Sequence, residues 1–177
     1  MRPIPVFLAF AAFLSLCNPQ STLGEELPMS HLVLTSPAFS HNGMIPAKYT
    51  CDGADVNPPL SIDGVPEKAK SLALIVDDPD APRGTWVHWV VWNIPADTRV
   101  IPEGTVPPGA LQGTNDFGSR KYGGPCPPSG THRYFFKLYA LDAPLALPPG
   151  ATKAQVEKAM SGHLLGKAET VGLYRRK

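Results

Sequence analysis

Two apolar segments, residues 71–76 and 86–94, constrain the fold of this chain more than any other feature. Both are apolar runs of strand length, which predicts two β-strands. One face of the first carries Leu72, Leu74, Val76 and Asp78, and one face of the second carries Trp86, His88, Val90, Trp92 and Ile94. Because a loop rich in Asp and Pro joins them, Asp78 and His88 fall at neighbouring strand ends, an arrangement typical of a pocket rim.

The distribution of proline indicates many short strands. The 177 residues include 21 prolines, against about 9 expected at the average usage of about 5%. They fall between apolar runs of strand length, so we expect turns between strands. The formal net charge is +1, and the only basic cluster is residues 175–177, which disfavours nucleic-acid binding.

Further elements complete the predicted fold. Short or extended pieces are expected at 31–35, 47–50, 61–65, around 100 and at 110–112, and longer strands at 134–141 and 164–174. Thr152 and Gln155 form a capping-box pattern and Gly162 suits a helix end, which predicts a helix at 152–161 docked on a sheet. We therefore expect a mainly β chain, an antiparallel Greek-key β-sandwich with one or two small helices, in a single domain over residues 30–177.

The first residues have the pattern of a targeting segment. Arg2 precedes an apolar run to Cys17, which predicts a signal peptide over residues 1–24 and a mature start between Asn18 and Met29. The protein is then periplasmic or secreted. Two alternatives stay open: a lipoprotein anchored through Cys17, and translation from Met29, which would make the protein cytoplasmic.

Titratable residues at strand ends are the candidate functional groups. Asp78, Asp80, His88 and His132 all lie there, and the glycines at 123 and 124 allow close backbone approach, so free amides could help hold an anion. Each residue alone is as well explained by a capped turn or a structural histidine. A zinc site using Asp78, His88, Cys126 and His132 lacks closely spaced ligand pairs. The Gly-x-Ser-x-Gly, His-Glu-x-x-His and Walker patterns are also missing from the sequence.

Three motifs give the chain a family resemblance. They are Asp78–Pro79–Asp80–Ala81–Pro82, Trp86–Val87–His88–Trp89, and Gly123–Gly124–Pro125–Cys126–Pro127–Pro128 followed by His132–Arg133–Tyr134. Together they resemble the phosphatidylethanolamine-binding protein family, also called the Raf kinase inhibitor protein family, and its bacterial branch in particular. The resemblance implies a β-sandwich with a small anion pocket. We expect no cofactor and no metal. The resemblance also implies the ligand-binding residues Asp78, His88, Gly124 and His132, with Asp80, Pro82 and Tyr134 beside them.

The same resemblance implies further properties. Members of the bacterial branch tend to form homodimers, and the family motif implies a cis peptide bond at Ala81–Pro82. The two cysteines of the mature chain, Cys51 and Cys126, could form a disulfide in an oxidising compartment. The cysteine motifs are shared with cytoplasmic relatives, however, so we expect buried free thiols.

The predicted function is non-catalytic binding of a phosphate-like ligand or phospholipid headgroup, with a protein partner left open. Affinity should fall as the pH rises past the ordinary histidine pKa of about 6.5, with Asp78 orienting an imidazole. The alternative is a phosphoester or lipid hydrolase with a pocket histidine as general acid/base. The sequence offers no activated nucleophile for such a hydrolase. A third alternative, protease inhibition, lacks an identifiable inhibitory loop in the sequence.

Overall fold

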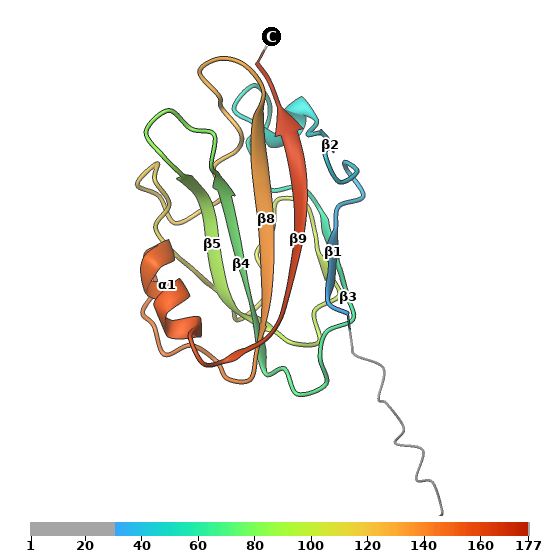
Figure 1. The fold of residues 1–177 in the computed structure, drawn as a ribbon, viewed down its shortest axis with the longest axis vertical. Helices are drawn as coiled ribbons and strands as arrows, with labels where there is room; N and C mark the ends of the chain where they lie inside the picture. Colours follow the sequence, from blue (N-terminus) through green and yellow to red (C-terminus); the bar gives the residue numbers. More distant parts are fainter. Residues whose placement is uncertain (1–30, 177) are drawn as a thin grey trace, which may run out of the picture.

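The computed structural model describes residues 31–176 and contains a β-sandwich with one α-helix against its larger sheet (Figure 1). The strands are β1 (Val33–Thr35), β2 (Gly43–Met44), β3 (Leu60–Asp63), β4 (Ser71–Asp78), β5 (Trp86–Pro95), β6 (Val100–Ile101), β7 (Leu111–Gln112), β8 (His132–Leu141) and β9 (Leu164–Tyr174). A 3₁₀ turn, η1, covers Ala47–Tyr49, and α1 covers Lys153–Met160. The predicted signal peptide, Cys17 and Met29 lie outside the described residues.

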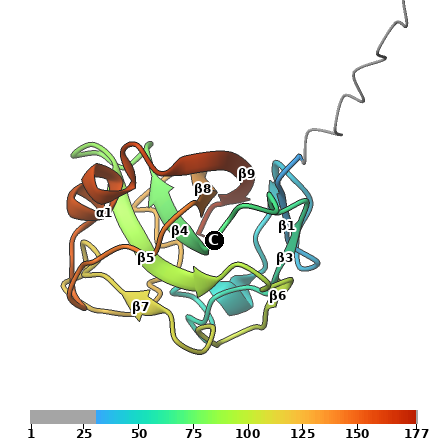
Figure 2. The ribbon, with the colours of Figure 1, turned by 90° about the horizontal axis from the view of Figure 1, so that it is seen from below.

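The strands form two sheets. The larger has the order β2-β9-β8-β4-β5-β7 and the smaller the order β1-β3-β6. All pairings are antiparallel except that of β2 with β9. Viewed from below, the smaller sheet lies on one side of the larger and α1 on the other (Figure 2). The predicted mainly β sandwich is thus confirmed.

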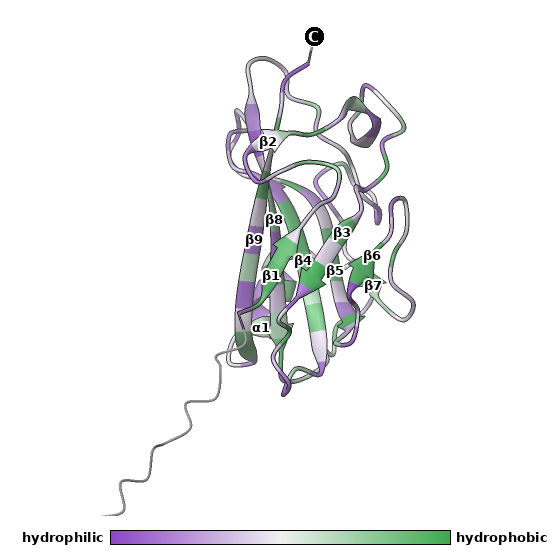
Figure 3. Cartoon of the chain, turned by 90° about the vertical axis from the view of Figure 1, so that its right-hand side faces the viewer, coloured by the Kyte–Doolittle hydropathy of each residue, from purple (hydrophilic) through white to green (hydrophobic). Residues whose placement is uncertain are grey.

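The central strand β4 is buried on both faces because it separates two apolar cores. Leu72, Leu74 and Val76 pack between the sheets, whereas Ala73 and Ile75 pack with residues of α1. Hydrophobic residues accordingly lie along strands of both sheets, including β1, β3 and β4 (Figure 3). This continuous burial explains why the segment has an almost unbroken apolar sequence.

Strand β5 contains two β-bulges that the alternation of its sequence did not reveal. Val76 pairs with Trp89 but Asp77 pairs with Val87, so His88 is an extra residue in the ladder. A second irregularity lies between the partners of Leu72 and Leu74. The predicted common face of Trp86, His88, Val90, Trp92 and Ile94 is therefore wrong: Val90 and Trp92 pack toward α1, and Ile94 packs between the sheets.

The helix is the element whose sequence signals were most direct. Thr152 caps α1, and its capping box with Gln155 is present. Gly162 follows with a positive φ of 84° and ends the helix. Val156 and Met160 are buried against the larger sheet, so the predicted helix and its docking are confirmed.

The segment 47–50, predicted to be extended, instead forms η1. Pro46 has a φ of −58°, and its carbonyl accepts a hydrogen bond from the Tyr49 amide at 3.0 Å. The Ala47 carbonyl accepts bonds from both the amide and the hydroxyl of Thr50, at 3.0 and 2.8 Å. These local hydrogen bonds close a turn, whereas the residues of a strand bond to a neighbouring strand.

Candidate functional site

A cavity of about 210 Å³ opens where β4 ends and where β5 and β8 begin. It is lined by Asp78, Ala81, Pro82, Trp86, His88, Phe117, Cys126, Pro127, Pro128, His132 and Tyr134. Of the seven predicted site residues, five are therefore together: Asp78, Pro82, His88, His132 and Tyr134. Most of the wall is apolar, so the few polar atoms at its base determine what the cavity can recognise.

Asp78 and His132 form a buried pair at the base of the cavity. The Nδ1 atom of His132 lies 2.7 Å from Oδ2 of Asp78, and the Asp80 amide donates to the other carboxylate oxygen at 2.8 Å. Because Nδ1 donates its proton to the Asp78 carboxylate, Nε2 is the ring nitrogen of His132 that remains for another partner. Asp78 therefore orients the imidazole, as the sequence predicted, while its own oxygens are engaged.

His88 is held differently, by backbone. Its Nδ1 lies 2.6 Å from the Gly123 carbonyl oxygen, and the Gly123 amide donates to the His88 carbonyl at 3.0 Å. Since a carbonyl only accepts, Nδ1 carries the proton. Burial lowers the pKa of His88, although the Gly123 carbonyl and Asp78 oppose the change. The ring is consequently neutral near pH 7, with a lone pair on Nε2.

Tyr134 contributes a hydroxyl group with no partner. The residue is 1% exposed, and within residues 31–176 its hydroxyl makes no hydrogen bond. Burial and the charge of Asp78 raise the pKa of Tyr134 well above its ordinary value, and the nearby Cys126 amide only partly offsets this. The phenol therefore stays protonated and is a donor beside the two imidazoles.

The other two predicted site residues lie outside the cavity lining. The Gly124 amide donates to Oδ1 of Asp55 at 2.6 Å, and a Cβ there would lie 2.6 Å from the same oxygen. With the Gly123 amide bonded to His88, neither glycine offers a free amide to an anion, and that prediction is wrong. Asp80 instead binds Arg133 through two contacts of 2.6 and 2.9 Å. The guanidinium lowers the pKa of Asp80 to about 2.

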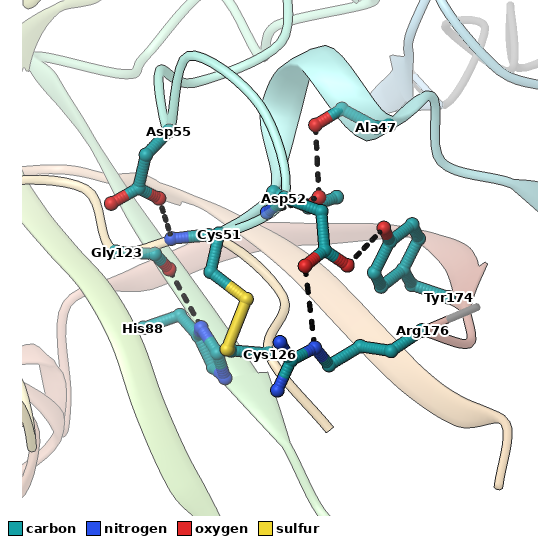
Figure 4. Close-up of a disulfide and its surroundings, with 11 residues drawn as sticks. Ala47, Cys51, Asp52, Asp55, His88, Gly123, Cys126, Tyr174 and Arg176 are labelled. Atoms are coloured by element: carbon teal, nitrogen blue, oxygen red, sulfur yellow. Dashed lines mark hydrogen bonds and ion pairs between the residues drawn. A yellow bond between two sulfur atoms is a disulfide. The ribbon is translucent and has the colours of Figure 1, made fainter. Parts of the chain in front are cut away.

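A disulfide joins Cys51 to Cys126, and both residues are exposed (Figure 4). The prediction of buried free thiols is therefore wrong. The physical reason is that the two loops are already paired: the Cys51 amide donates to the Pro125 carbonyl at 3.1 Å. Asp55 binds the second loop through Gly124. Because Cys126 lines the cavity, the crosslink fixes part of its wall.

The loop at Pro82 also differs from the prediction. All peptide bonds in residues 31–176 are trans, so the expected cis bond at Ala81–Pro82 is wrong. The chain reverses instead through a turn in which the Gly84 amide donates to the Ala81 carbonyl at 3.0 Å, with a φ of 100° at Gly84. Together with the extra residue in β5, this turn brings His88 into the cavity that Asp78 lines.

Two residues that form or support the cavity lie outside the three family motifs and were missed by sequence reasoning. Phe117 is 48% exposed and stands at the cavity edge, with its ring 5.3 Å from that of His88. Asn115 holds its loop: its carbonyl oxygen accepts from the Phe117 amide at 3.1 Å, and its Nδ2 donates to the His88 carbonyl at 3.2 Å. The only signal was a turn-like Asn-Asp-Phe-Gly sequence in a segment without periodicity.

The described residues lack both a metal-binding cluster and a membrane-spanning helix. Within residues 31–176 no group of three His, Cys, Asp or Glu side chains is arranged to hold a metal ion. In the same range, no helix combines the length and apolar character needed to cross a membrane.

Known proteins resemble this chain over most of its length. The family model described as phosphatidylethanolamine-binding protein matches residues 35–175. A UPF0098 protein of Methanothermobacter thermautotrophicus is 58% identical over 148 residues, which cover 81% of this chain and 98% of the relative. A UPF0098 protein of Pyrococcus abyssi is 53% identical over 163 residues, covering 87% and 88%.

Solved structures agree. The PEBP homologue CT736 from Chlamydia trachomatis has a TM-score of 0.81 at 44% identity, covering 84% of this chain and 99% of that one. YbcL from E. coli, described as a member of the mammalian PEBP family, has a TM-score of 0.78 at 34% identity, covering 83% and 99%. By its sequence motifs, its fold and these matches, the chain belongs to the phosphatidylethanolamine-binding protein family.

Proposed function

We propose that the protein binds a small ligand through a phosphate-like oxyanion, free or on a phospholipid headgroup, without catalysing its conversion. The observation that carries this proposal is the unpartnered, buried hydroxyl of Tyr134 at the cavity. A buried polar group without a hydrogen bond costs about 1–3 kcal/mol. The hydroxyl oxygen has less than 1 Å² exposed, so a ligand oxygen reaches it only when the ring shifts toward the cavity. The bond then removes that penalty, which favours an oxyanion over an apolar ligand.

The ring nitrogens support the same class of ligand. His132 and His88 both line the cavity with Nδ1 already bonded, so each presents Nε2 as its remaining polar atom. When the His132 ring is protonated, its Nε2 donates a charge-assisted bond to the oxyanion. The carboxylate of Asp78 opposes a free anion by its charge, and we therefore expect weak binding, with a Kd on the order of 1 mM.

The size of the cavity limits how much of a ligand it can hold. At about 210 Å³ it is smaller than the roughly 300–1,000 Å³ typical of sites for drug-sized molecules. It accommodates the anionic end of a ligand, with any ester group extending past Phe117 and the prolines at the edge. This size supports recognition of a headgroup and not of a whole lipid.

Hydrolysis is the weaker reading. The neutral His88 ring has a lone pair and could accept a proton. However, the lining contains no serine, threonine or free thiol that could serve as a nucleophile, because Cys126 is bonded to Cys51. The release of inorganic phosphate from phenyl phosphate, at a rate above that of a buffer blank, would establish the hydrolase instead.

The location and assembly that we predicted from the sequence belong to this proposal. The exposed disulfide supports a periplasmic or secreted protein, since such bonds persist in oxidising compartments. A homodimer is proposed on the family resemblance alone. Mass spectrometry of the native protein checks the mature N-terminus and the oligomeric state, and a monomer would refute the dimer.

The binding test is calorimetric titration of inorganic phosphate at pH 6 and pH 8. The test variant is His132→Ala. The matched control is His163→Ala, because His163 forms an equivalent Nδ1 contact of 2.7 Å with Asp142, at the opposite end of β8 and β9. We expect the wild type and the His163 variant to bind at pH 6 and more weakly at pH 8.

The His132 variant should lose at least about tenfold in affinity, the loss of one charge-assisted bond. Thermal unfolding of each variant checks that the fold is retained. Equal phosphate binding by all three proteins at both pH values would contradict the proposed site.

A further inference from the structure

The acceptor character of His88 is set by its surroundings. The ring donates from Nδ1 to the Gly123 carbonyl at 2.6 Å. It also packs edge-on against Phe117 and Tyr134, with ring centroids at 5.3 and 5.2 Å. A Cβ at Gly123 would lie 2.6 Å from the Phe117 ring, so the close approach of these groups depends on glycine. With Nδ1 held as a donor, a neutral ring has only an acceptor at Nε2.

The charged groups around His88 favour a protonated ring, but burial has the larger effect on its pKa. From β4, Asp78 and the more distant Asp77 favour a charged ring, and from the 122–128 segment so do the backbone groups of Gly123 and Gly124. From β8, His132 is the other titratable group at the cavity besides Tyr134, whose phenol stays neutral. Desolvation outweighs the favourable contributions and lowers the pKa of His88.

We propose that the pocket selects an oxyanion that carries its own proton, namely a singly protonated phosphate or phosphomonoester, whose P–O–H group donates to Nε2 of His88. This inference rests on the proposed function and narrows it, because the phosphodiester of an intact phospholipid headgroup has no acidic proton. The anionic oxygens of the same ligand face the Tyr134 hydroxyl and the His132 ring. The three polar groups thus require both an acceptor and a donor from the ligand.

This requirement separates ligands of equal charge. A sulfate monoester and a phosphodiester are monoanions without an acidic proton, so an oxygen lone pair would face the lone pair of His88. A site that cannot form the hydrogen bond to His88 Nε2 binds the proton-free ester with much lower affinity. Because the cavity is open to solvent and water can intervene, we expect a discrimination of about 10-fold to 100-fold.

The test compares phenyl phosphate, phenyl sulfate and methyl phenyl phosphate by calorimetry on the wild-type protein. The diester represents the linkage of a phospholipid headgroup, and inorganic phosphate is included to represent the free ion. A phosphomonoester has its second pKa near 6, so pH 5.5 favours the singly protonated form and pH 8 the dianion. The ¹⁵N shift of His88 Nε2 at pH 5.5 checks that this ring is neutral there. The sulfate ester keeps one charge at both pH values and reports on changes in the protein alone.

At pH 5.5 we expect phenyl phosphate to bind at least about 10-fold more tightly than either proton-free ester, with the preference disappearing at pH 8. His88→Gln, whose amide can donate or accept, should lose the preference while still binding phenyl phosphate. If that variant fails to fold, the wild-type ligand series still decides.

The selection by His88 and the proposed function are tested by different outcomes. Equal binding of phenyl phosphate and phenyl sulfate at pH 5.5 would overturn the selection by His88 and leave the proposed function standing. Equal binding of phenyl phosphate and methyl phenyl phosphate would also overturn it and would favour a diester headgroup as the ligand. If no oxyanion binds at either pH, the proposed function itself is wrong.

Discussion

Asp77 and Asp78 are neighbours at the end of β4, yet they lie on opposite faces of the larger sheet. The Asp77 side chain is fully buried on the α1 face, where Lys137 and Lys153 approach to 2.7 and 2.6 Å. Asp78 lies at the cavity, where it binds His132 at 2.7 Å and the Asp80 amide at 2.8 Å. Alternation along a strand is the reason that one dipeptide serves two regions.

The difference between the partners separates a carboxylate neutralised within the fold from one at the proposed binding site. Lysine ammonium groups are permanent cations near neutral pH, and their contacts neutralise Asp77 between the sheet and α1. Histidine has a second ring nitrogen, so Asp78 holds a side chain that can still bind another group through Nε2. A buried charge pair alone therefore does not mark a site; a partner with an unused polar atom does.

The largest expected effect concerns Asp77. Asp77→Asn leaves two lysines beside a buried neutral amide, and we expect a loss of about 3–5 kcal/mol in the free energy of unfolding. Phosphate affinity should change less than about twofold, because the cavity lies on the other face. Urea unfolding and calorimetry measure the two quantities. A stable variant that loses phosphate binding would reverse the roles assigned to the two carboxylates.

The second effect concerns the crosslink on the cavity side. Replacing both cysteines, Cys51→Ser with Cys126→Ser, removes a crosslink between residues 75 apart in the chain. The free energy of unfolding should fall by about 2–4 kcal/mol. Unlike Asp77→Asn, the double replacement should also weaken phosphate binding, because Cys126 lines the cavity. Urea midpoints and phosphate titration of the double variant check this. An unchanged midpoint would show that the disulfide contributes nothing to stability.

A smaller effect is expected at the edge of the cavity. Phe117→Ala removes an aromatic contact worth about 0.5–1.5 kcal/mol, and affinity for phenyl phosphate should fall about 3-fold to 10-fold. Binding of inorganic phosphate should be nearly unchanged, since it does not reach the edge. Val100→Ala, at an exposed valine, is the matched control. Equal losses for both ligands would instead mean that Phe117 shapes the base of the cavity.

The smallest effect concerns Asp80, the third carboxylate of the motif. Its pKa is lowered to about 2, so its contribution to stability is present above the unfolded value near 4 and is lost as the pH falls toward 2. The ion pair with Arg133 is largely exposed. Asp80→Asn should therefore cost less than about 1 kcal/mol at pH 7, and less still at pH 2.5. Unfolding free energies at both pH values check the sign, which a growing difference at low pH would contradict.

The sequence predicted those features that local patterns determine. The apolar run of β4, the alternation in β8 and the capping box at Thr152 identified these elements, and the family motifs identified five residues at the cavity. The bulge at His88 could not be predicted, because an extra residue in a ladder depends on the partner strand. Nor could the use of the Gly124 amide by Asp55, a contact between residues 69 apart in the chain.

The disulfide shows a different limit. The pairing depends on the approach of two loops across the fold, and the two cysteines lie 75 residues apart. Knowledge of related motifs favoured free thiols, and only the arrangement of the loops decided the matter. Phe117 was missed because residues 95–124 combine short strands and turns without a period.

The most direct measurement of the central claim is a ¹⁵N NMR spectrum of the imidazole nitrogens during a phosphate titration at pH 6. The chain has 5 histidines, and only two of them, His88 and His132, line the cavity. We predict that the Nε2 resonances of these two shift with phosphate and saturate together, while His163, with the same contact to a carboxylate, does not move. A shift confined to His163 or shared equally by all five would contradict an oxyanion site at the end of β4.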